Sequence, residues 1–190
     1  MNAQEEITGK TGEGFVSSFV CNTTKALNKE LWGIGLNFVY YPVKKIGVGL
    51  NLNFTGFRTI NETYSYTISE PAISNSQYGI VCQYNLIQSH KILTTLGVSS
   101  GLSQINLGDK AILVKAGGFS QPKTITSDYY FAVEPGLSFS YKTWSAEGGF
   151  LWFTAGVKYC FLISGKTEFG SSNEFSNYLF FLGVSSAILK

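Results

Sequence analysis

The sequence predicts an all-β protein, an eight-stranded antiparallel up-and-down transmembrane β-barrel. Three observations predict it. Residues 31–57 alternate with period two on both sides of a turn at 42–45, which is typical of a β-hairpin. The polar positions of this hairpin are Gly, Asn and Thr, not charged residues. Charged residues make up only 14% of the chain and aromatic residues 15%, whereas soluble domains carry roughly 25% charged residues.

The two faces of the hairpin differ in size and polarity. A sheet that faces water usually carries Lys, Glu and Arg on its polar face. A small polar interior with a broad apolar exterior is instead typical of a membrane barrel. The alternative is a soluble, secreted, lipocalin-like barrel that binds an apolar ligand and keeps its large side chains inside. For the membrane barrel we expect these large residues to point outward: Trp32, Ile34, Leu36, Phe38, Val48, Leu50, Leu52, Phe54, Leu96, Val98, Phe131, Leu137, Phe180, Leu182 and Val184.

The chain divides into a flexible lead at residues 1–13 and one barrel domain at residues 14–190. Beyond the hairpin at 31–57, strands are predicted at 14–22, 77–86, 92–105, 129–141, 144–162 and 176–189. Pro135 cannot donate to a ladder, so a bulge or a later strand start is expected there. The parity of the apolar residues changes within 144–162, which predicts either a bulge at Gly148-Gly149 or a break into two strands.

The connections between these strands alternate in length. Short turns are predicted at 42–45, 87–91 and 142–143, and longer loops at 23–30, 58–76, 106–128 and 163–175. A meander places successive connections at opposite ends, so the short turns share one end and the loops the other. Aromatic residues gather near both ends of the strands, as expected for belts at two lipid–water interfaces. They are Tyr40, Tyr84, Tyr141 and Trp144 at the turn end, and Trp32, Phe57, Tyr78, Tyr129 and Tyr178 at the loop end.

Three segments carry a family resemblance: FVYYPVKKIGVGLNLNF, VEPGLSFSY and the ending FFLGVSSAILK. With them the chain resembles the small outer-membrane β-barrel domain proteins of Gram-negative bacteria, and is similar to OmpX and to the barrel of OmpA. The resemblance implies a bacterial outer-membrane location with both termini in the periplasm. It also implies a structural role in the cell envelope or adhesion at the surface. Members usually end on an aromatic residue, whereas this chain ends Ile188-Leu189-Lys190.

Two charged residues, Glu134 and Lys158, fall at inward positions of neighbouring predicted strands. A lone charge inside a barrel is costly, whereas a hydrogen-bonded pair is tolerated. We therefore expect an ion pair in the lumen, with Asn51, Asn53 and Gln83 as polar neighbours. Eight strands enclose a space that side chains nearly fill, so no wide water channel is expected.

The sequence does not indicate an enzyme, a metal site or a cofactor. The only histidine, His90, falls in a predicted turn. Cys21, Cys82 and Cys160 are far apart, and no C-x-x-C motif occurs, so we expect buried or lipid-facing thiols. A net charge of +2 gives no indication of nucleic-acid binding.

Two predicted loops are longer than strand closure requires. The first, at 58–76, contains Tyr64 and Tyr66 among Ser, Thr and Asn, a composition typical of adaptable contact surfaces. The second, at 106–128, places Lys115, Phe119 and Lys123 near the apolar residues 112–114. These residues predict binding of a host or matrix protein, or of a surface glycan, by a monomeric barrel. In the alternative, the loops have no dedicated partner, and 112–114 extend the barrel as a hairpin above the membrane.

Overall fold

The structure, a computed structural model, describes residues 14–43, 45–60, 68–89, 91–116, 118–146, 149–163 and 172–189. Within them, no helix is long and apolar enough to cross a membrane. The elements are β1 (Gly14–Ala26), β2 (Lys29–Val43), β3 (Ile46–Thr55), β4 (Arg58–Thr59), β5 (Pro71–Gln88), β6 (Ile92–Ala116), β7 (Phe119–Ala146), β8 (Gly149–Ile163), α2 (Ser172–Phe175) and β9 (Asn177–Leu189).

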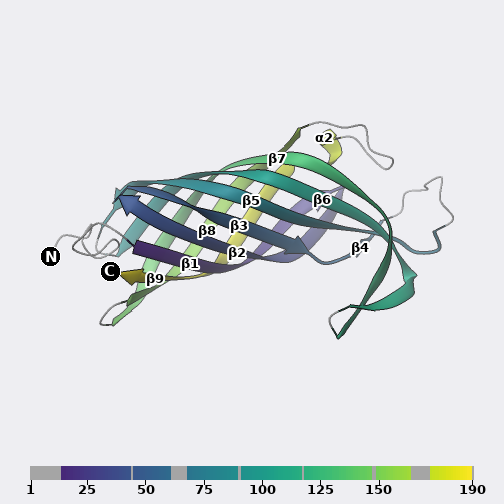
Figure 1. Ribbon diagram of the computed structural model, residues 1–190, viewed down its shortest axis with the longest axis horizontal. Coiled ribbons are helices and arrows are strands. Elements are labelled where there is room, and N and C mark those ends of the chain that lie inside the picture. Colours follow the sequence, from purple (N-terminus) through teal and green to yellow (C-terminus); the bar gives the residue numbers. More distant parts are fainter. Residues whose placement is uncertain are drawn as a thin grey trace.

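Eight of the strands close into one antiparallel ring (Figure 1). The order is β3-β2-β1-β9-β8-β7-β6-β5, and pairing of β3 with β5 closes it. The first and last strands are neighbours, with Gly14 opposite Leu189. The two-residue β4 pairs with β5 beyond the end of β3. The predicted eight-stranded up-and-down barrel is therefore confirmed.

The two faces of the barrel wall are arranged as predicted. Twelve of the fifteen large apolar residues expected to point outward are exposed, with Trp32 at 58%. Leu36, Leu52 and Phe54 are half-buried beside neighbours on the same outer face. The small polar residues point inward, and Asn51 is only 2% exposed. Because the apolar side chains cover the outside, the barrel is built the opposite way to the lipocalin-like alternative.

The aromatic residues expected at the interfaces also lie on the outer face. At the turn end Tyr40, Tyr84, Tyr141 and Trp144 are exposed, and at the loop end Trp32, Tyr78, Tyr129 and Tyr178 are exposed, while Phe57 is half-buried. On β2 the two belts are joined by the stretch from Trp32 to Tyr40. Its length matches the roughly 9–11 tilted residues that cross a bilayer. The outer surface is therefore that of a membrane-spanning barrel.

The connection between β1 and β2 was predicted wrongly. A longer loop was expected at 23–30, but the strands continue and a two-residue turn, Leu27-Asn28, joins them. Both turn residues have positive φ, 47° and 57°. Such a turn matches the twist of a hairpin, but it usually uses Asn or Gly at both positions. Leu27 is buried at the loop end of the barrel, which offsets the strain of its backbone.

Most of the described residues in the loops predicted at 58–76 and 106–128 are in strands. β4 takes the start of the first, and β5 begins at Pro71. The second is a hairpin in which β6 continues to Ala116 and β7 begins at Phe119. The alternative in which 112–114 extend the barrel as a hairpin is the correct one, over a longer range than expected. Figure 1 shows this extension at the end of the barrel opposite the start of β1, bending away from the long axis.

The turn predicted at 142–143 does not exist. β7 runs on to Ala146, and its register with β8 shifts between Lys142 and Trp144. The strand predicted at 144–162 is indeed broken, because Trp144 belongs to β7 whereas β8 begins at Gly149. The bulge therefore lies near Thr143; of the predicted Gly148-Gly149, Gly148 lies outside the described residues and Gly149 begins β8. This bulge and the change of strand together reverse the parity of the apolar residues.

Pro135 lies inside β7 without a bulge, so that prediction was also wrong. Toward β6 it is paired with Val98. Toward β8, pairing is absent at Glu134 and Pro135 but resumes at Gly136 in an unchanged register. The barrel therefore accommodates the missing N–H by a short gap in one ladder.

Candidate functional site

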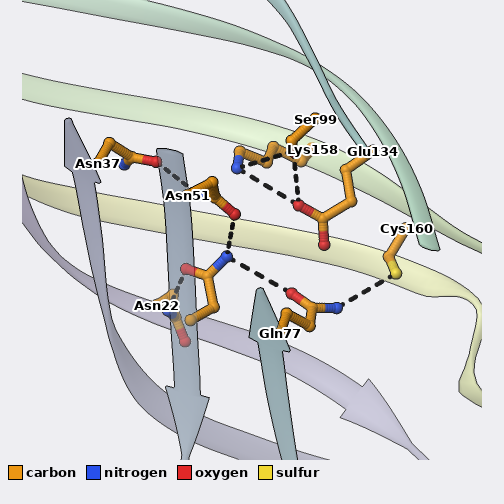
Figure 2. A network of polar contacts seen from close by, with 9 residues as sticks. Asn22, Asn37, Asn51, Gln77, Ser99, Glu134, Lys158 and Cys160 are labelled. Atoms are coloured by element: carbon orange, nitrogen blue, oxygen red, sulfur yellow. Dashed lines mark hydrogen bonds and ion pairs between the residues drawn. The ribbon is translucent and has the colours of Figure 1, made fainter. Parts of the chain in front are cut away.

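The centre of the lumen holds a chain of amide side chains (Figure 2). Asn22 donates to Asn53 Oδ1 at 3.2 Å, and Asn53 donates to Asn51 Oδ1 at 2.8 Å and to Gln77 Oε1 at 3.5 Å. Asn51 in turn donates to Asn37 Oδ1. These residues come from β1, β2, β3 and β5, so their hydrogen bonds link four neighbouring strands along one side of the interior. The alternation of Asn with apolar residues in the sequence indicated this polar lining.

The predicted pair of charges lies beside this chain. Lys158 Nζ is 3.4 Å from Glu134 Oε2, and Ser99 Oγ donates to the same carboxylate oxygen at 2.9 Å. The side chain of Glu134 is 4% exposed and that of Lys158 14%. In the same region, Gln77 Nε2 donates to the buried Cys160 Sγ at 3.3 Å. Glu134 and Lys158 therefore form an internal ion pair with a hydroxyl as a third partner.

The polar residues predicted as neighbours of the Glu134–Lys158 pair lie in two different parts of the lumen. Asn51 lines a small cavity together with Ser99 and Glu134. Gln83 lies elsewhere, accepting a hydrogen bond from Tyr41 Oη at 2.9 Å. Tyr41 packs with Val39 and Val81 in a small buried apolar cluster. Parity predicted which residues point inward, but it could not predict their height along the barrel.

The loop end of the lumen is filled by an apolar plug that the sequence reasoning missed. Its buried residues come from the loop-end parts of six strands, the β1–β2 turn, the residue after β4 and α2. Phe175 and Tyr130 contact each other with ring centroids 6.0 Å apart. The residues are Ala26, Leu27, Leu31, Ile60, Ile73, Ile105, Leu107, Tyr130, Ala132, Cys160, Leu162 and Phe175. Inward parity was readable for Leu31, which shares it with Gly33 and Gly35. The placement of Ile60 and Phe175 depends on tertiary structure alone.

A carboxylate near the plug fixes the chain that leads into β5. Asp109 accepts hydrogen bonds from the backbone N–H groups of Ser69, Glu70 and Ala111 at 2.9–3.1 Å. Burial by itself raises the pKa of the Asp109 carboxyl, but the three donors outweigh burial and hold that pKa below its ordinary value. Asp109 therefore acts as an ionised anchor for residues 69–70.

The residues predicted to bind a partner are only partly described. Tyr64 and Tyr66 lie outside the described residues, and so does the side chain of Phe119, although its backbone begins β7. Lys115 and Lys123 are exposed on the β6–β7 extension, near the exposed side chains of Ile112, Leu113, Val114 and Ile125. The structure thus brings three of the five predicted residues onto one ribbon and describes the side chains of two of them, Lys115 and Lys123.

The β6–β7 extension is a two-stranded ribbon above the barrel wall. Pairing of β5 with β6 ends at Asp109, and pairing of β7 with β8 begins only at Phe131. Between these points both outer edges of the ribbon lack a strand partner within the described residues. The outer part of the ribbon, residues 110–125, includes Lys110, Lys115 and Lys123 but no Asp or Glu, so this part is basic. An exposed ribbon of this kind presents both free backbone edges and positive charge.

The closed ring, the apolar outer face and the polar interior define the protein as an eight-stranded transmembrane β-barrel of the outer-membrane type. Three similar solved structures have this fold. Neisserial surface protein A aligns with a TM-score of 0.54 and 11% identity, over 93% of this chain and 96% of that one. Ail, the attachment invasion locus protein of Yersinia pestis, aligns with 0.52 and 13%, over 93% and 99%. OprG of Pseudomonas aeruginosa aligns with 0.54 and 12%, over 98% and 99%.

These likenesses cover nearly the whole chain, and at such low identity they show the fold alone. No protein-family model matches the chain, and no curated protein matches its sequence.

Proposed function

We propose that this protein is a monomeric bacterial outer-membrane barrel that is not an enzyme. In this proposal both termini are periplasmic, the lumen is closed, and the loop end binds a partner outside the cell while the barrel supports the envelope. The basic β6–β7 extension carries the proposal, because Lys115, Lys123 and exposed apolar residues project together beyond the barrel wall. Ail, one of the similar structures, was solved in complex with the heparin analogue sucrose octasulfate, which makes a surface glycan a reasonable partner class.

The closed lumen is supported by two successive barriers. The apolar plug around Phe175 fills the loop end, and the amide chain with the Glu134–Lys158 pair crosses the middle. A hydrated ion that passed through would have to displace buried apolar side chains and break a buried ion pair. We therefore expect no appreciable conductance when the purified full chain is inserted into planar lipid bilayers. Steady single-channel currents would contradict the closed lumen.

The binding role is tested by shortening the extension. A variant in which residues 110–125 are replaced by Asn-Gly leaves a four-residue connection that begins with Gly108-Asp109. Leu107 and Thr126 then remain paired, so the barrel wall below keeps its register. We expect cells that display this variant to attach less to host cells or matrix than cells displaying the unchanged protein. A variant with Lys91→Gln at the turn end serves as the control and should attach normally. If the shortened barrel inserts and attachment is unchanged, binding through the extension is wrong and only the structural role remains.

A further inference from the structure

The outer wall changes from apolar to polar just above the loop-end aromatic belt. On β5 the outward positions pass from Tyr78 to Ser76 and Ser74, and on β6 they pass from Leu102 to Gln104 and Asn106. An open groove of about 730 Å³ lies over these polar positions. Residues of the β6–β7 extension form its far side, and the rings of Phe54 and Phe57 line it as well. The groove therefore faces outward and reaches from the level of the loop-end aromatic belt, where Phe57 lies, to the β6–β7 extension.

The floor of the groove is a ladder of amides and hydroxyls. Asn106 is its centre: its amide donates to Ser74 Oγ at 3.3 Å, and its Oδ1 accepts from Gln104 Nε2 at 2.9 Å and from Ser127 Oγ at 2.7 Å. A side-chain amide has two N–H donors and a carbonyl acceptor, so these bonds leave capacity for a ligand. Phe57 lies against Gly108, where an added Cβ would come within 2.9 Å of its ring. Hydroxyl-binding amides beside an aromatic ring suit the polar edges and apolar faces of a sugar.

A basic hollow adjoins the groove. It measures about 280 Å³ and is lined by Lys29, Glu30, Arg58, Thr59 and Lys110, and Lys110 also lines the groove. Three cations and one carboxylate give these side chains a net charge of 3 − 1 = +2.

Two of the three cations of the hollow are held in place by neutral groups. Arg58 Nε donates to the Glu30 carbonyl at 3.3 Å, and Lys110 Nζ donates to Thr59 Oγ1 at 2.9 Å. The ion pair found within the described residues is the internal Glu134–Lys158 pair, so none of these three cations forms an ion pair with a described carboxylate. The hollow therefore has positive charge available for an anion.

We propose that the groove and the hollow together form one binding site for an anionic saccharide. A sugar ring lies against Phe57 and hydrogen-bonds to the ladder around Asn106. A sulfate or phosphate ester on that sugar reaches Arg58 and Lys110, where a guanidinium can bind two oxygens at once. This inference deepens the proposed surface-binding role and rests on it. The same chemistry is offered by a free glycan and by the phosphorylated sugar headgroup of a glycolipid in the same membrane.

The site is tested with the full chain folded in detergent micelles, by titration calorimetry with a fully sulfated disaccharide and with its unsulfated counterpart. We expect the sulfated disaccharide to bind. Arg58→Gln should lower its affinity by about tenfold, because a charge-assisted contact is lost. Lys110→Gln should have a similar effect. Lys142→Gln, at the turn end, is the matched control and should not alter binding. Circular dichroism confirms that each variant is folded.

The aromatic wall has a separate test. Phe57→Ala should lower the affinity for the sulfated disaccharide but leave the weak binding of inorganic sulfate unchanged. Arg58→Gln should lower the affinity for both ligands. Undetectable binding of the disaccharide, or binding that Arg58→Gln and Lys110→Gln leave unchanged, would overturn the proposal. If cell attachment still depended on the extension in that case, the surface-binding function would stand and this site alone would be wrong.

The source of the saccharide is separated by a competition experiment. The protein is placed in lipid nanodiscs with or without a glycolipid that carries a phosphorylated disaccharide headgroup. If the glycolipid prevents binding of the soluble sulfated disaccharide, the site binds the headgroup of a lipid in its own membrane. If the soluble ligand binds equally in both nanodiscs, the site takes free glycans. Either result supports an anionic-saccharide site, and absence of binding in both preparations overturns it.

Discussion

Gly136 lies opposite Lys158 in the ladder between β7 and β8, and its missing side chain makes room for the lysine stem. A Cβ at Gly136 would lie 2.6 Å from Lys158 Cγ and 2.8 Å from the carbonyl oxygen of Val157. With that space free, Lys158 reaches Glu134 on the strand that also carries Gly136. The ion pair in the lumen thus depends on a glycine as well as on two charges.

Breaking this ion pair from one side should destabilise the barrel. Lys158→Met leaves the Glu134 carboxylate buried without its cation, which is expected to cost about 3–5 kcal/mol of unfolding free energy. The double variant Glu134→Gln with Lys158→Met should recover most of that loss, because no uncompensated charge remains. Urea unfolding in lipid vesicles, followed by tryptophan fluorescence, measures both values. Equal stability of the single and double variants would contradict a penalty from an unpaired buried carboxylate at Glu134.

Glycines at close strand contacts should tolerate no side chain. An added Cβ at Gly101 would lie 2.0 Å from the Tyr78 carbonyl oxygen and 2.5 Å from the Gly79 Cα, and neither backbone atom can move without disturbing the ladder. We expect Gly101→Ala to lower the yield of folded barrel and its unfolding free energy. Gly97→Ala, on the same strand, is the control because its Cβ would meet nothing closer than 3.5 Å. Refolding yields that are equal for the two variants would contradict the close approach.

The three cysteines should differ in their reactivity toward maleimides, because their surroundings differ. Cys21 and Cys82 are exposed on the outer face, within the band between the aromatic belts, whereas Cys160 is buried inside. In lipid vesicles we expect a membrane-permeant apolar maleimide to label Cys21 and Cys82, and a charged maleimide to label neither. Cys160 should react only after unfolding. Mass spectrometry of the labelled peptides checks this, and rapid labelling of Cys82 by the charged reagent would place its strand outside the lipid.

The Asp109 anchor should make the loop end sensitive to acid. Because the folded pKa of Asp109 lies below the ordinary carboxyl value of 3.8, ionised Asp109 contributes stability that is present above that value. That stability is lost as the pH falls from there through the lowered folded pKa. Hydrogen exchange at Ser69 and Glu70 should therefore show protection at pH 6 that disappears in strong acid. Asp109→Asn should remove much of this protection at pH 6, and unchanged exchange in that variant would contradict the anchor.

The sequence by itself determined the class of fold and the facing of the wall. Period two is a local property of an extended chain, so the outward position of Trp32 and the inward position of Asn51 could be read directly. The same parity placed Glu134 and Lys158 on the inner face of adjacent strands. It did not determine where strands end, because extended chain continues as long as a neighbouring strand supplies hydrogen bonds. That is why the connections at 23–30, 106–128 and 142–143 were misassigned.

Tertiary structure alone decided the height of each residue along the barrel and the contacts that close it. Ile60 and Phe175 enter the plug from segments outside the barrel wall. No periodicity in the sequence relates them to the strands whose side chains they contact. Arg58, Thr59 and Lys110 meet because β4 continues the line of β3 along one edge of β5, while β6 pairs with the other edge. Alternation specifies which side of a sheet a residue faces, whereas strand register and tilt specify its neighbours. Register is set by pairing along whole strands, so these contacts could be known only from the closed barrel.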